Sequence, residues 1–119
     1  MTDSFAMLQV VDRDTLLEVR ILVDTIVDET DIQAMDREFK SVIERRDAPK
    51  IVVNFQNVQH LSSSALGTLI SLNSAIQDRG GQLCLAEING AIQEVFKITK
   101  LDRIFAIEKT ADEARASLS

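Results

Sequence analysis

The segment at residues 51–55, IVVNF, constrains the fold more than any other stretch of the chain. It is short, rich in β-branched residues and apolar except for Asn54, which is typical of a strand buried on both faces of a parallel sheet. Parallel strands are joined by crossover helices, so helices must cover both faces of such a sheet. The segment therefore predicts an α/β fold.

The residues before this strand predict a hairpin and a helix. Apolar runs at 7–11 and 16–22 flank a polar turn, and the second run alternates apolar with charged residues, as a half-buried hairpin does. From Thr30 the apolar residues follow helical spacing to about Arg46, and Thr30 with Gln33 fits a capping box.

The residues after the strand alternate helices with further strands. A serine-led helix ends at Gly80-Gly81; its stripe is Leu66, Leu69, Ile70, Asn73 and Ile76. A strand at 83–86, a short helix capped by Asn89, a strand at 104–107 and a helix with a Thr110/Glu113 capping box follow. We thus predict one domain over residues 1–119, ordered ββαβαβαβα, with a mixed, mostly parallel sheet covered by about four helices.

Charge and composition exclude several classes of function. The chain has 13 Lys and Arg against 19 Asp and Glu, a net charge of −6, which is unsuited to binding nucleic acid or anionic lipid. A single His and a single Cys cannot form a zinc site or a disulfide framework. We expect a non-catalytic protein without metal or cofactor.

The sequence also predicts where the protein is found. It has no run of about 20 apolar residues, and its first residues, MTDSFAML, do not resemble a signal peptide. We therefore expect a cytoplasmic protein that does not insert into membranes.

The segment at residues 51–72, IVVNFQNVQHLSSSALGTLISL, resembles the signature of the STAS family, whose members include bacterial anti-sigma factor antagonists. In that signature a buried strand and a short turn lead to Asp-Ser-Ser-Gly-Leu-Gly at the start of a helix. The corresponding residues here are Ser62-Ser63-Ser64-Ala65-Leu66-Gly67, so Ser62 replaces the Asp and Ala65 the first Gly. The order of elements and the stretch GGQLCLAEINGAIQEVFKITKLDRIFAI match as well, so the resemblance covers nearly the whole chain.

The resemblance implies a function and a set of site residues. In the family, the serine before the first Gly is phosphorylated by an ATP-dependent kinase that is often the anti-sigma factor itself. That serine corresponds to Ser64, with Ser63 as the alternative. The unphosphorylated form binds the anti-sigma factor and releases the sigma factor. The implied partner-binding residues are Ser62, Ser63, Ser64, Gly67 and either Asp24 or Asp28 in the loop before the first helix.

Elementary electrostatics gives the same residues a physical interpretation. A serine at a strand-to-helix turn caps the helix, and a phosphate at this position is favoured by the helix dipole and unpaired amides. It would add about −1.5 to −2 charges to a docking surface, so we expect it to repel a partner without unfolding the domain.

Two alternatives stay open at the level of sequence. In the first alternative, phosphorylation is weakened or lost, because Ser62 lacks the family's carboxylate and Ala65 adds a methyl group. The protein would then bind its partner constitutively. In the other, the chain is a scaffold or accessory subunit of a stress-signalling complex or transporter. The antagonist is expected to be a monomer or weak homodimer, whereas a scaffold is expected in a larger assembly.

Overall fold

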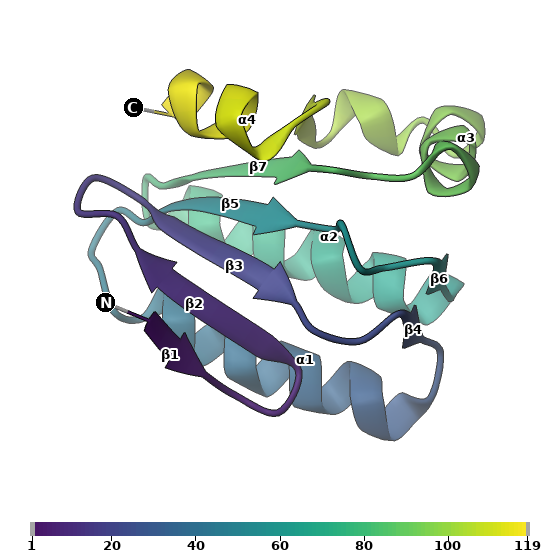
Figure 1. The fold of residues 1–119 in the computed structure, drawn as a ribbon, viewed down its shortest axis with the longest axis horizontal. Coiled ribbons are helices and arrows are strands. Elements are labelled where there is room, and N and C mark those ends of the chain that lie inside the picture. The colour runs from purple at the N-terminus through teal and green to yellow at the C-terminus, as the bar shows by residue number, and fades with distance from the viewer. Residues whose placement is uncertain (1, 119) are drawn as a thin grey trace.

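The computed structural model describes residues 2–118 and forms an α/β domain built on a six-stranded sheet (Figure 1). The strands of this sheet, in spatial order, are β1 (Thr2–Ser4), β2 (Leu8–Asp12), β3 (Leu17–Ile21), β5 (Lys50–Asn54), β7 (Gln82–Ala86) and β8 (Ala106–Glu108). Two short strands, β4 (Thr25–Ile26) and β6 (His60–Leu61), form a separate parallel pair. The helices are α1 (Glu29–Ile43), α2 (Ser63–Asp78), α3 (Gly90–Ile98), the 3₁₀ turn η1 (Leu101–Arg103) and α4 (Ala111–Leu118).

The sheet topology confirms the predicted mixed architecture. Strands β1, β2 and β3 are antiparallel neighbours, whereas β3, β5, β7 and β8 are parallel. Ile51, Val52 and Val53 of β5 are fully buried, as a strand in the middle of a parallel sheet requires.

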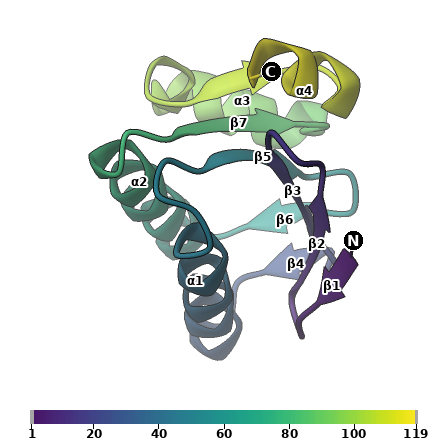
Figure 2. The same ribbon diagram turned by 90° about the vertical axis from the view of Figure 1, so that its left-hand side faces the viewer.

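Helices lie on both faces of the sheet. Helices α1 and α2 cover one face and α4 covers the other, as the two views show together (Figures 1 and 2). The larger core lies beneath α1 and α2 and also contains Ile92 and Phe96 of α3. The smaller core lies beneath α4 and includes Leu16, Val52 and the buried Cys84.

The start of α1 differs from the prediction. The helix begins at Glu29 with Asp28 as its N-cap residue, so the predicted Thr30/Gln33 capping box is wrong. The Ile32 N–H donates to the Asp28 carbonyl (3.0 Å), which starts the first turn two residues earlier than expected. The helix ends at Ile43, about three residues before the predicted Arg46.

The other helix ends confirm the predictions from capping residues. Gly80 has φ of +77° directly after α2, where an L side chain would be strained. The Asn89 side chain accepts from the Ile92 N–H (2.8 Å) at the start of α3, and the Thr110 hydroxyl accepts from the Glu113 N–H (3.1 Å) in α4.

The last strand is shorter than predicted. Strand β8 begins at Ala106, so the predicted residues Ile104 and Phe105 lie outside it. Both of their N–H groups donate to the Leu101 carbonyl (3.0 Å each). The N–H groups of Ile104 and Phe105 are therefore bonded to η1 and are not available to extend β8.

An ion pair between the buried Glu18 of β3 and Arg115 joins α4 to the sheet. The Glu18 side chain of β3 has no solvent exposure and contacts three guanidinium groups: Arg13 (2.9 Å), Arg20 (3.1 Å) and Arg115 of α4 (2.5 Å). Burial alone would raise the pKa of Glu18, but the hydrogen bonds from Arg20 and Arg115 and the nearby positive charges outweigh it. The pKa of Glu18 therefore lies below its usual value.

This lowered pKa predicts an acid-sensitive contact between α4 and the sheet. A carboxyl group whose pKa is lower in the folded state contributes stability above its unfolded pKa, and that stability is lost as the pH falls through the folded pKa. We expect the free energy of unfolding to fall from pH 5 towards pH 3, and to fall less steeply in Glu18→Gln. Urea denaturation at several pH values measures both slopes, and equal slopes would contradict the assignment.

Candidate functional site

The serine turn, residues 62–64, lies at the carboxyl end of the central strands and starts α2. Ser62 is the N-cap residue, and its hydroxyl oxygen accepts from the Ala65 N–H (3.1 Å). Ser63 and Ser64 are the first two residues of the helix; both are exposed. Neither of their hydroxyl groups hydrogen-bonds to another residue in the described part of the chain. The three serines are therefore not equivalent, because Ser62 has a structural role.

The loop before α1 is joined to the serine turn through the backbone. Strands β4 and β6 pair Thr25 with His60 and Ile26 with Leu61. The Asp24 carbonyl accepts from the N–H groups of residues 59 and 60 (2.7 and 3.0 Å), and the Ile26 carbonyl accepts from the Ser62 N–H (3.1 Å). The structure thus brings the segment containing Asp24 and Asp28 next to the serine turn, and both aspartates are exposed.

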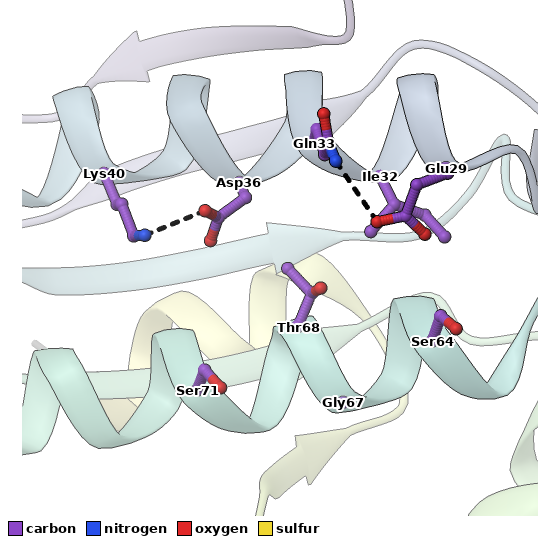
Figure 3. Close-up of a pocket in the computed structure, with 9 residues that line it drawn as sticks. All are labelled: Glu29, Ile32, Gln33, Asp36, Lys40, Ser64, Gly67, Thr68 and Ser71. Carbon is purple, nitrogen blue, oxygen red and sulfur yellow. Dashed lines mark hydrogen bonds and ion pairs between the residues drawn. The ribbon is translucent and has the colours of Figure 1, made fainter.

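A groove of about 510 Å³ runs between α1 and α2 and begins at the serine turn (Figure 3). Hydroxyl groups of α2 line one side of it, three or four residues apart, which places them on one face of the helix. The lining residues are Ser64, Gly67, Thr68 and Ser71 of α2 and Glu29, Ile32, Gln33, Asp36 and Lys40 of α1. Ser64 therefore belongs both to the serine turn and to the groove.

The charges of the groove leave it slightly acidic. Lys40 forms an ion pair with Asp36 (2.8 Å), and Gln33 donates to Glu29 (3.4 Å). Lys40 is the one cation among the nine residues that line the groove, and it is already paired. No lining side chain is therefore available to neutralise an anion placed on Ser64.

Gly67 lies on the exposed side of α2, with free space where a side chain would be. A Cβ atom added at this position would meet no described atom within 4 Å, so packing inside the domain does not require a glycine here. Glycine within a helix costs about 0.5–1 kcal/mol relative to alanine. A residue that weakens the helix without helping its packing points to a role at the surface.

The sequence analysis did not predict that Leu22 and Val27, two apolar residues near Asp24 and Asp28, are exposed. Leu22 and Val27 are 42% and 51% exposed and lie on either side of β4. Single exposed apolar side chains are common on protein surfaces, so these two are of interest because they flank β4, which pairs with β6 beside the serine turn. The available signal was a valine directly before Asp28 and Glu29 at the start of a helix.

The two departures from the STAS signature have structural explanations. Ala65 is fully buried, so its methyl group packs in the core and adds no bulk to the surface around Ser64. Ser62 caps α2 as an aspartate could, so the replacement removes a charge and keeps the cap. The buried position of Ala65 does not support the expectation that its added methyl group weakens phosphorylation.

The described residues contain no group of three or more His, Cys, Asp or Glu side chains arranged to hold a metal ion. Within residues 2–118, no helix combines the length and apolar character needed to span a membrane.

The family model for the STAS domain matches residues 8–114. The chain belongs to the STAS domain family. Among its relatives, the anti-sigma F factor antagonist of Paenibacillus polymyxa is 26% identical over 70 residues, which cover 59% of this chain and 60% of that protein. The alignment therefore spans less than two thirds of that relative.

Solved structures show the same fold. An anti-sigma-factor antagonist STAS domain protein from Planctomyces limnophilus superposes with a TM-score of 0.83 at 18% identity, covering 98% of this chain and all of the other. The Bacillus cell fate determinant SpoIIAA in its phosphorylated form gives a TM-score of 0.69 at 17% identity, covering 94% of this chain and 99% of the other. Identities this low establish the fold alone.

The capping geometry predicts that the serines differ in their effect on stability. Ser62→Ala should lower the free energy of unfolding by about 1 kcal/mol because the Ala65 N–H loses its acceptor. Ser62→Asp should restore most of that loss, since a carboxylate also caps a helix and interacts favourably with its dipole. Thermal and urea denaturation measure the changes, with Ser64→Ala as the control. A larger loss in Ser64→Ala than in Ser62→Ala would refute the assignment.

Proposed function

We propose that this STAS domain is an anti-sigma factor antagonist that binds its partner through the serine turn and is switched by phosphorylation of Ser64. The partner is an anti-sigma factor with serine kinase activity, and the antagonist itself performs no catalysis. Binding releases the sigma factor, and phosphorylation ends the binding. The name of the Paenibacillus polymyxa relative supports this class of function.

The observation that carries the proposal is the exposed, unpaired hydroxyl group of Ser64 at the start of α2. A kinase needs a hydroxyl group that it can reach, and Ser64 is exposed whereas Ser62 is engaged as a cap. Ser63 is the alternative acceptor, since it is also exposed. The β4–β6 pairing holds Asp24, Val27 and Asp28 beside the turn, so a partner that covers Ser64 would contact this loop as well.

The charges around Ser64 explain how a phosphate would act. Glu29 and Asp36 already make the adjoining groove acidic, and Lys40 is paired. A phosphate adding about −1.5 to −2 charges would gain little from these side chains and would remain directed to solvent. Its charge and bulk would therefore face the partner, which fits a switch by repulsion at the surface and leaves the fold unchanged.

Charge substitution at Ser64 tests the switch. With the cognate anti-sigma factor kinase and ATP, we expect phosphate at Ser64 by mass spectrometry and none in Ser64→Ala. In the absence of ATP, we expect Ser64→Asp to bind the partner at least about tenfold more weakly than the native chain does, because like-charge contacts at an interface cost several kcal/mol. Calorimetry measures binding, and Ser74→Asp on the same helix serves as the charge-matched control. Equal binding by Ser64→Asp and the control, with no phosphate at residues 62–64, would contradict the switch.

Gly67→Ala separates binding from stability. The added methyl group should raise the free energy of unfolding by about 0.5–1 kcal/mol, because it favours the helix and meets no described atom. The same methyl group should weaken binding if the partner approaches the helix closely at this point. Denaturation and calorimetry measure the two effects, and a stabilised variant with unchanged affinity would place the partner elsewhere.

The alternative, a scaffold or accessory subunit without phosphorylation, predicts a different behaviour in solution. Size-exclusion chromatography of the pure protein should give a monomer or dimer for the antagonist and a larger assembly for the scaffold. A large assembly whose size does not respond to Ser64→Asp would favour the scaffold.

A further inference from the structure

We propose that Asn89 positions the serine turn for its partner, through a hydrogen bond that is separate from its role as the cap of α3. Asn89 lies outside the serine turn, the aspartate loop and the groove, and it acts on them through the backbone. The inference rests on the proposed function, because it concerns how Ser64 is presented to the anti-sigma factor kinase.

The Asn89 carboxamide bonds to two different parts of the chain. Its oxygen accepts from the Ile92 N–H (2.8 Å), which caps α3. Its nitrogen donates to the carbonyl of Val58 (3.1 Å), 31 residues earlier in the sequence. A backbone N–H can only donate, so the bond from Ile92 requires the oxygen on the α3 side and leaves the NH₂ group for Val58. The side chain therefore joins α3 to the loop at residues 55–62.

Capping alone does not account for an asparagine at position 89. Aspartate and serine cap helices about as well as asparagine does. An ionised aspartate has acceptors only, so it could bond to the Ile92 N–H but could not donate to the Val58 carbonyl. A serine hydroxyl stands one atom nearer the backbone than the carboxamide nitrogen does. Of these residue types, asparagine is the one suited to both bonds.

The loop at residues 55–62 is held by carboxamides on two sides. The Asn57 side chain donates to the Ile21 carbonyl at the end of β3 (3.3 Å). The bond from Asn89 holds the opposite side, at Val58, whose side chain is 1% exposed and belongs to the larger core. The loop is thus fixed between β3 and α3 just before it enters the serine turn.

A short, fully paired segment links Val58 to the serine turn. Residues 59–61 alone separate Val58 from Ser62, the N-cap of α2. The N–H groups of residues 59 and 60 donate to the Asp24 carbonyl, and the Ser62 N–H donates to the Ile26 carbonyl. With so few residues between them, a displacement of Val58 would be passed on to Ser62 and to the two exposed serines that follow it.

A loop that is already held favours binding. A partner that covers the serine turn would otherwise have to order residues 55–62, which lowers its affinity. The net contribution of one neutral hydrogen bond corresponds to about a twofold to tenfold change in an equilibrium constant. Phosphoryl transfer is equally sensitive to position, because the accepting hydroxyl must be in line with the transferred phosphoryl group.

Asn89→Asp tests the bond to Val58 separately from the cap. The carboxylate keeps the cap of α3 but cannot donate to the Val58 carbonyl. By NMR hydrogen exchange, we expect the amides of residues 59–62 to exchange at least about threefold faster, while the Ile92 amide is unchanged. Gln93→Glu makes the same change from carboxamide to carboxylate on α3 and serves as the control.

The same variants test the effect on the partner. In calorimetry without ATP, we expect Asn89→Asp to bind the anti-sigma factor about twofold to tenfold more weakly than Gln93→Glu does, at an equal urea midpoint. The kcat/KM for phosphorylation of Ser64 should fall by a similar factor. Asn89→Ser keeps a cap without adding charge and should show the same losses. Asn89→Ala removes both bonds and should lower the urea midpoint as well.

Three outcomes would overturn the proposal. Unchanged exchange of residues 59–62 in Asn89→Asp and Asn89→Ser would show that the bond does not hold the turn. Faster exchange with unchanged binding and phosphorylation would show that the partner is insensitive to it. Losses of binding that follow the urea midpoint across the variants would leave Asn89 with a role in stability only. A native chain that is neither bound nor phosphorylated would instead contradict the proposed function, and the exchange rates would still decide whether Asn89 holds the turn.

Discussion

The complete burial of β5 determines the arrangement of the rest of the domain. Its apolar side chains require cover on both faces, which α1 and α2 provide on one side and α4 on the other. Its parallel neighbours β3 and β7 require crossover connections, and the connection that leaves β5 passes through β6 into α2. The serine turn is therefore a consequence of the central strand, because the crossover that leaves β5 must lead into a helix, and α2 starts after residues 55–62.

The candidate site is held by backbone rather than by side-chain contacts. Hydrogen bonds from residues 59, 60 and 62 to the carbonyls of Asp24 and Ile26 fix the two loops against each other. The aspartate and serine side chains at the surface are thereby left available for a partner. A substitution of Asp24 or Ser64 can then change binding with little effect on the fold, which is what a surface switch requires.

The sequence predicted the elements whose signals are local. Asn89, Gly80 and Thr110 marked helix ends correctly because capping depends on a few neighbouring residues. The β4–β6 pairing was not predicted, because two strands of two residues, about 35 positions apart, leave no periodicity. The start of α1 was predicted wrongly at Thr30. Threonine is a good capping residue, but the helix begins two residues earlier, with Asp28 as the N-cap directly after the β4 segment. Whether the predicted site residues act as proposed depends on a partner, which neither periodicity nor capping can specify.

Helix α2 carries features that internal stability alone does not explain. An alanine at Gly67 would favour the helix and meet no described atom, and Asn73 is a polar residue on the otherwise apolar buried stripe of α2. Gly67 lines the groove beside the serine turn, and Asn73 lines a separate hollow where β7 begins. Local rules of helix stability fail most often where a protein binds something else. Gly67 is such a position, and it is explained if α2 is the element through which this domain meets its partner, as proposed.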